Sequence, residues 1–130
     1  MNSYVTDAHA LFWYLVNSSK LGAAASHAFD EGARGTAEIG IPAIVFAEFY
    51  FLNIKLGKPL DFADVFRRID SGQQYVLLPR LPADVLDFDQ DAAVTEMHDR
   101  MIVGAARRRG ASLITADRQI TQRAAVPIVW

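Results

Sequence analysis

Five carboxylates in this sequence stand at positions from which their side chains could act together. Two stand at the ends of short β-prone segments, two lie three residues apart at the start of a predicted helix, and one is surrounded by apolar residues. They are, in that order, Asp7 and Asp117, Glu96 and Asp99, and Glu48. Clustered carboxylates repel one another, and some take up protons unless a cation lies among them. Mg²⁺ and Mn²⁺ prefer oxygen ligands, and a pair of such ions can activate a water and stabilise the leaving oxygen of a phosphodiester. These residue types therefore indicate metal-dependent phosphodiester hydrolysis, which needs no Ser, Cys or His nucleophile.

The order of predicted elements explains why these acids should meet. We expect strands at 3–6, 38–41, 75–78, 112–115 and 127–130. The apolar spacing and the turn residues predict helices over 10–16, 21–31, 43–56, 61–70, 97–109 and 118–123, with partial helix in the acidic stretch 84–95. Alternating strands and helices are typical of an α/β fold whose parallel sheet is covered by helices on both faces. We expect one domain, spanning residues 1–130.

In such a sheet, ligands bind at the carboxyl ends of the strands. Asp7 ends the first strand and Asp117 the fourth, while Glu48 lies in the second turn of a helix that begins at the same edge. The helix over 97–109 precedes the fourth strand, so it must also begin there, with Glu96 and Asp99 on one face at i, i+3. Four separate segments should therefore bring five carboxylates to one rim of the sheet.

Each of these acids also has a simpler explanation. An aspartate after a strand is often a turn residue or the cap of the next helix, and Glu96 and Asp99 could stabilise a helix N-terminus through its dipole. Glu48 is harder to explain in this way, because a lone carboxylate among apolar residues is costly unless it is paired or binds a metal. The convergence of all five on one edge carries the prediction.

Composition limits the other classes of protein that the chain could be. Hydrophobic residues make up 52% of 130 residues, which excludes a disordered tail. The absence of cysteine excludes a disulfide scaffold, a zinc finger, an iron–sulfur site and a cysteine nucleophile, and fits a cytoplasmic protein. The start of the chain has no basic leader pattern, and the longest apolar runs are far shorter than the roughly 20 residues of a membrane span, so we expect no membrane partner.

Four sequence pieces together resemble PIN-domain endoribonucleases, and closely the VapC-type toxins of bacterial toxin–antitoxin pairs. The pieces are Tyr4–Leu11 with Trp13, Ile41–Glu48, Glu96–Val103 and Leu113–Arg118. By that resemblance Asp7, Glu48, Asp99 and Asp117 are the catalytic and metal-binding quartet, and Glu96 is an accessory ligand. The resemblance also implies a five-stranded sheet in the order 3-2-1-4-5, in which the first and fourth strands are neighbours.

The same resemblance implies an activity and partners. Such toxins are Mg²⁺- or Mn²⁺-dependent endoribonucleases that cut single-stranded regions of RNA, commonly in tRNA or ribosomal RNA loops. They usually form homodimers, and a cognate antitoxin protein holds them inactive. The expected function is therefore that of a toxin whose metal-activated water cleaves RNA.

Two other functions stay open from the sequence. A PIN-type nuclease of RNA maturation would use identical residues, so only the neighbouring genes would distinguish it from a toxin. A phospho-accepting α/β module would also place acids at strand ends, but it needs a lysine near its last strand, and no lysine follows Lys58. A non-catalytic binding protein is disfavoured because all four quartet acids are present.

A few further residues could contribute to the site or to its partners. Thr115 precedes Asp117 and could orient a water at the mouth of the site. We expect a structural or electrostatic role for Arg100 and a non-catalytic role for His98, and the basic run 107–109 suits a helix C-terminus. The aromatic stretches 12–14 and 46–51 cover more than one helix face, which suggests a protein partner.

The formal net charge of −2 is unusual for a nucleic-acid-binding protein, because bulk attraction to phosphate needs a basic surface. Two bound divalent cations would convert this charge to +2 at the place where a phosphate must lie. We therefore expect nucleic-acid binding to depend on the metal.

Overall fold

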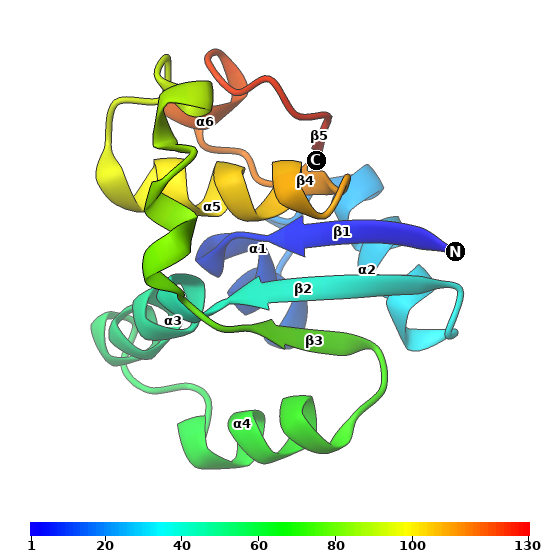
Figure 1. Cartoon of the computed structure of the whole chain (residues 1–130). Helices are drawn as coiled ribbons and strands as arrows, with labels where there is room; N and C mark the ends of the chain where they lie inside the picture. The colour runs from blue at the N-terminus through cyan, green and yellow to red at the C-terminus, as the bar shows by residue number, and fades with distance from the viewer.

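Five parallel strands form one sheet in this computed structural model, which describes residues 1–130. The strands are β1 (Asn2–Thr6), β2 (Ala37–Pro42), β3 (Tyr75–Leu78), β4 (Ser112–Ile114) and β5 (Ile128–Val129). Their spatial order is β3-β2-β1-β4-β5, and every neighbouring pair is parallel (Figure 1). The predicted fold class and strand order are confirmed.

Six α-helices and two short 3-10 helices connect the strands. They are α1 (Ala8–Leu15), α2 (Ala23–Ala33), α3 (Ala43–Lys55), α4 (Phe62–Ser71), η1 (Pro82–Val85), η2 (Phe88–Asp91), α5 (Met97–Arg108) and α6 (Arg118–Thr121). The first helix begins at Ala8, two residues earlier than predicted, because the Asp7 carboxylate caps it by accepting from the N–H of Ala10. The partial helix expected over 84–95 is instead the pair η1 and η2.

Helices lie on both faces of the sheet, as predicted (Figure 1). The α5 helix packs on β1 and β4 on one face, α1 and α2 lie against the other face, and α4 runs beside β3. The helices and strands share one hydrophobic core, whose largest fully buried side chains include Phe12, Phe29, Phe49, Ile39 and Leu113. No helix is both long enough and apolar enough to cross a bilayer.

The pairing of β1 with β4 sets up the candidate site. Thr6 pairs with Ile114, so the residues that follow, Asp7 and Thr115, leave the two central strands side by side. Both strands end in buried residues because a parallel sheet with helices on both faces excludes water from its middle strands. Asp7 and Thr115 thus lie at the boundary between the core and the sheet edge, 7% and 0% exposed.

Candidate functional site

Asp7 is held rigidly by three neighbouring groups. Its N–H donates to the Ile114 carbonyl at 3.1 Å, which extends the β1–β4 ladder by one residue. Its Oδ1 accepts from the N–H of Ala10 at 2.8 Å, and its Oδ2 accepts from the Thr115 hydroxyl at 2.5 Å. Each carboxylate oxygen has a second lone pair, so both remain able to bind a cation.

Thr115 connects the first acid to the last. Its Oγ1 donates to Asp7 and accepts from the N–H of Asp117 at 3.1 Å, so one hydroxyl orients both segments. The Asp117 carboxylate in turn accepts from the N–H of Gln119 at 2.8 Å and caps α6. The sequence predicted Thr115 at the mouth of the site, and the structure gives it a positioning contact with Asp7 there.

Glu96 and Asp99 are joined through a helix cap. The Glu96 carboxylate accepts from the N–H of Asp99 at 2.7 Å, which makes Glu96 the N-cap of α5 and places Asp99 in its first turn. The expectation that both lie on one helical face is wrong, because Glu96 precedes the helix with extended backbone. His98 lies 2.9 Å from Glu96 through its Nδ1, a contact that the sequence did not indicate.

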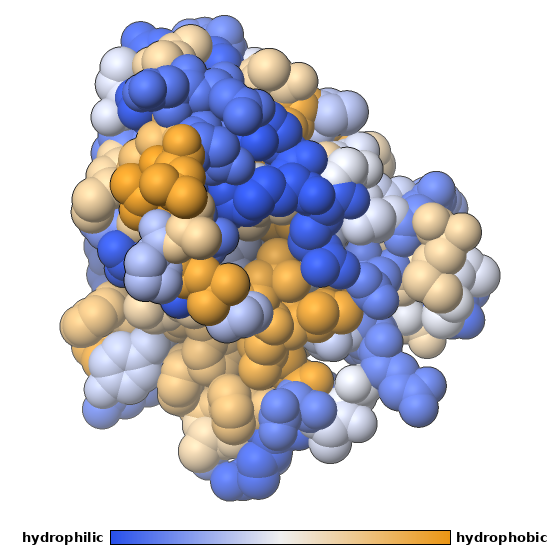
Figure 2. Space-filling model, viewed as in Figure 1, coloured by the Kyte–Doolittle hydropathy of each residue, from blue (hydrophilic) through white to orange (hydrophobic).

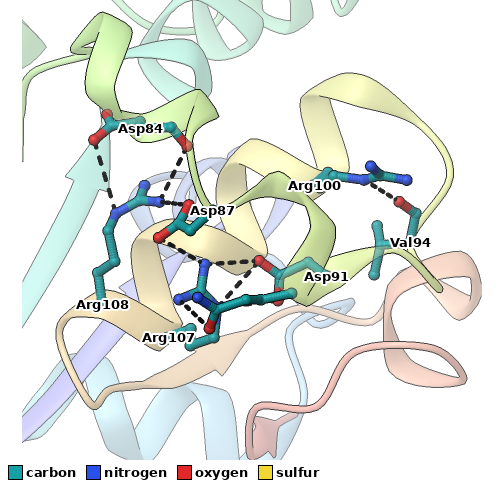
Figure 3. A network of polar contacts seen from close by, with 8 residues as sticks. Asp84, Asp87, Asp91, Val94, Arg100, Arg107 and Arg108 are labelled. Carbon is teal, nitrogen blue, oxygen red and sulfur yellow. Dashed lines mark hydrogen bonds and ion pairs between the residues drawn. The ribbon is translucent and has the colours of Figure 1, made fainter.

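Arg100 holds the segment that leads into this cap. Its Nε donates to the Val94 carbonyl at 2.6 Å (Figure 3). Its Nη2 donates to the Ala92 carbonyl at 3.2 Å. The guanidinium also lies 5.8 Å from the centroid of the Phe88 ring. Arg100 therefore fixes the backbone immediately before Glu96, which agrees with the structural role expected for it.

A second set of ion pairs ties η1 and η2 to the other end of α5 (Figure 3). Arg107 donates to Asp91, whose side chain is 1% exposed, and also contacts Asp87 at 3.0 Å. Arg108 lies 3.0 Å from Asp87 and 3.8 Å from Asp84. The basic run was expected only to complement the helix dipole, and the sequence did not reveal these partners because they lie 16 to 24 residues away. The network fixes the whole 82–96 segment on the helix that carries Asp99.

The site acids repel one another. Burial, and after it the charges of Asp117, Glu96 and Asp7, together raise the pKa of Asp99 to about 6. Burial also raises the pKa of Glu48, with Asp99, Asp7 and Glu96 adding to the effect. The only basic group within ion-pair distance of any of the five acids is His98. The cluster therefore concentrates negative charge with almost no internal compensation.

The pKa values of Asp7 and Glu96 shift in opposite directions. Burial raises the pKa of Asp7, although the hydrogen bonds from Thr115 and Ala10 oppose this and stabilise the ionised form. Burial also acts to raise the pKa of Glu96, but the N–H groups of Asp99 and His98 and the His98 ring outweigh it, so that this pKa is lowered. Glu96 therefore ionises more readily than an ordinary glutamate, unlike Asp7, Glu48 and Asp99, whose pKa values are raised.

The donor chemistry of this cluster suits a hard divalent cation. No group of three or more His, Asp or Glu side chains is arranged here to hold one metal ion. Mg²⁺ does not require such a group, because it typically binds one or two carboxylates and completes its octahedron with waters and substrate phosphates. The mutual repulsion among Asp7, Glu48 and Asp99 is the feature that a cation would relieve.

Comparisons with known proteins bear on the same residues. The family model for the PIN domain matches residues 4–126. The chain belongs to the PIN domain family. The match covers all five carboxylates of this PIN domain, and PIN domains are nucleases that generally use divalent metals. No curated protein matches the chain by sequence.

Several solved structures share this PIN fold at low sequence identity. VapBC2 from Rickettsia felis bound to a promoter DNA fragment has a TM-score of 0.67 at 14% identity, covering 97% of this chain and 96% of that one. VapBC-1 from nontypeable Haemophilus influenzae has a TM-score of 0.61 at 17% identity, covering 97% and 96%. The PIN domain endonuclease Utp24 has a TM-score of 0.51 at 18% identity, covering 97% and 82%.

Proposed function

We propose that this PIN domain, residues 1–130, is the toxin of a type II toxin–antitoxin pair and an endoribonuclease that depends on Mg²⁺ or Mn²⁺. The observation that carries the proposal is that Asp7, Glu48, Asp99 and Asp117, from four segments, lie close enough for their charges to repel, with His98 as the only basic group within ion-pair distance of the site. Membership of the PIN family and the likeness to two VapBC complexes support it. The proposed substrate is a single-stranded region of RNA, such as a tRNA or ribosomal RNA loop.

The proposed site divides its tasks among the chain's own residues. Asp7, Glu48, Asp99 and Asp117 would hold the cation, with Glu96 as an accessory ligand. When bound, a divalent cation supplies Lewis acidity for the attack of water on phosphorus and for the departure of the 3′ oxygen. Thr115 keeps the Asp7 carboxylate in one orientation, and Arg100 keeps Glu96 and Asp99 at the start of α5. Cleavage by this chemistry leaves 5′-phosphate and 3′-hydroxyl ends.

Two apolar surfaces support the proposal of protein partners, an antitoxin and a second copy of the chain. Figure 2 shows an apolar hollow below α5, a cavity of about 180 Å³ whose lining includes Ile44, Leu78, Leu81 and Met101. Aromatic and aliphatic side chains are also exposed along α3 and α4, among them Tyr50, Phe51, Ile54 and Phe66. Exposed apolar areas of this kind mark protein interfaces. We propose that antitoxin and homodimer contacts share these surfaces, in the cytoplasm where the RNA lies.

A second candidate function is that of a PIN nuclease of RNA maturation. This alternative stays open because such a nuclease would use the same carboxylates, and the PIN domain endonuclease Utp24, which is not a VapBC complex, shares the fold. The two functions predict the same cleavage chemistry but different physiology, because a maturation enzyme would not arrest growth when it is expressed without a partner. No observation favours a phospho-accepting module or a non-catalytic binding protein.

Induced expression of the chain alone in a bacterial host tests the proposed function. Wild type should arrest growth and generate new RNA 5′-phosphate ends at discrete sites, while Asp7→Asn should do neither at equal protein level. Arrest by both chains, or wild-type expression without new 5′-phosphate ends, would contradict the proposal. Cleavage at discrete sites without arrest would favour RNA maturation.

A further inference from the structure

The second half of α1 carries three consecutive aromatic residues, and one of them differs from the other two. Phe12 is buried against Phe49, with ring centroids 5.6 Å apart. Tyr14 stacks on Phe29 at 4.5 Å with an interplanar angle of 12°, and its hydroxyl donates to Asp30. Phe12 therefore packs in the core, and Tyr14 packs against α2.

Trp13 instead faces polar residues at the surface. Its ring lies 6.0 Å from the His9 ring at a tilt of 48°, and the Lys20 Nζ lies 4.8 Å from its centroid. Trp13 is half-buried, whereas His9 and Lys20 are exposed. Phe12 supports Trp13 from behind, at 5.6 Å and an interplanar angle of 81°. The indole is thus fixed by the core on one side and accessible on the other.

This cluster of His9, Trp13 and Lys20 begins next to the acidic site. Asp7 is the N-cap of α1, and His9 lies in the first turn of that helix, two residues from Asp7. Trp13 follows one helical turn later, about 6 Å along the axis. Lys20 has no carboxylate within ion-pair distance, so its ammonium is available to a phosphate.

We infer that His9 and Trp13 form a stacking platform for a base of a single-stranded nucleic acid, and that Lys20 binds a phosphate of the same strand. Aromatic faces bind bases without regard to sequence, while nearby cations follow the backbone. A cation over an exposed aromatic ring is held weakly, so Lys20 can leave the indole when a base takes its place. This inference rests on the proposed function and adds a substrate subsite that the metal-binding acids cannot supply.

The chain offers a direct optical test, because it contains only two tryptophans, Trp13 and Trp130. In the Trp130→Phe protein, which keeps all five carboxylates, Trp13 is the only indole. With Mg²⁺ present, titration with a single-stranded RNA oligonucleotide that carries cleavage-resistant phosphorothioate linkages should quench the Trp13 emission with saturation. The matched protein carrying Trp13→Phe, which retains Trp130, should show no quenching. An oligonucleotide of the same length without bases should bind without quenching Trp13.

Binding measured by anisotropy separates the two parts of the platform. Trp13→Ala should weaken RNA binding by about tenfold or more, and in the active protein should raise KM with little change in kcat. Lys20→Met should reduce the slope of log affinity against log salt by about 0.7, and Lys55→Met, the control at the end of α3, should leave it unchanged. RNA binding with unchanged Trp13 emission and unchanged KM in Trp13→Ala would overturn the platform.

The outcomes also distinguish this inference from the proposed function. If wild type cleaves RNA with Mg²⁺ but Trp13 does not respond, the platform is wrong and the nuclease assignment stands. If oligonucleotides quench Trp13 but no metal supports cleavage, the platform stands and the nuclease assignment fails. If the oligonucleotides do not bind at all, the platform is overturned whatever the cleavage assay shows.

Discussion

Replacing Asp99 by asparagine should make the metal-free protein more stable while removing its activity. Burial and the charges of Asp117, Glu96 and Asp7 hold the pKa of Asp99 at about 6, against an ordinary value of 3.8. A shift of that size corresponds to about 3 kcal/mol of unfavourable free energy for the charged form. Because Asp99 is only partly buried, solvent screens this interaction, and we expect a gain of about 1–2 kcal/mol.

The effect should depend on pH in a defined window. The pKa of Asp99 is higher in the folded protein than in the unfolded chain, so the folded state binds this proton more tightly. The resulting stability is fully present below pH 3.8 and is lost as the pH rises through about 6. The advantage of Asp99→Asn over wild type should therefore be complete near pH 7.5 and should disappear near pH 4.

Thermal or urea unfolding in EDTA measures this difference. At pH 7.5 the melting temperature of Asp99→Asn should exceed that of wild type by about 4–7 °C. Asp89→Asn, which removes an exposed carboxylate outside the cluster, should leave the melting temperature unchanged. Added Mg²⁺ should stabilise wild type and have little effect on Asp99→Asn. Equal or lower stability of Asp99→Asn in EDTA at pH 7.5 would refute the repulsion argument.

Two other substitutions test the supports of the site, and a third tests the connection between α3 and α4. Thr115→Val should lower the free energy of unfolding, measured in urea, by about 1–3 kcal/mol, because it removes a buried hydrogen-bond donor from Asp7. Thr115→Ser keeps the hydroxyl and should therefore retain most of that free energy. Arg107→Met should cost about 3–5 kcal/mol by leaving the buried Asp91 carboxylate unpaired, and a loss below 1 kcal/mol would contradict the role of the network. Asn53→Ala should lower the free energy of unfolding by about 1–3 kcal/mol, because the buried Asn53 amide forms hydrogen bonds with both the N–H and the carbonyl of Leu60. An unchanged free energy of unfolding would contradict this role of Asn53.

The fold was predictable because periodic signals and breakers agree along most of the chain, outside the 82–96 segment. Strand segments alternate with helices, and glycines such as Gly110 end helices where a left-handed residue is needed. The edge of the sheet that carries the acids was predictable from the topology alone. The helix that precedes β4 must run back along the sheet, so it begins at the edge where β1 and β4 end. The acids Asp7 and Asp117 could be assigned to that edge for the same reason.

The contacts that hold the site were not predictable. The pairing of Arg107 with Asp91 and the donation from Arg100 to Val94 depend on the path of the 82–96 segment, which contains no apolar periodicity. The short 3-10 helices of this segment are fixed by those tertiary contacts and not by local propensity. Likewise, the sequence shows three adjacent aromatic residues in α1, but only the structure shows that Trp13 is the one that lies beside His9 and Lys20.

The most direct measurement is cleavage of a single-stranded RNA by the purified chain, with Mg²⁺ or Mn²⁺ titrated after treatment with EDTA. The account predicts no cleavage in EDTA, saturable recovery with either ion, and products with 5′-phosphate ends. It predicts no recovery at any ion concentration for Asp99→Asn that is otherwise folded. Full activity in EDTA, or wild-type rates from Asp99→Asn, would contradict the assignment of the carboxylate cluster as a metal-dependent nuclease site.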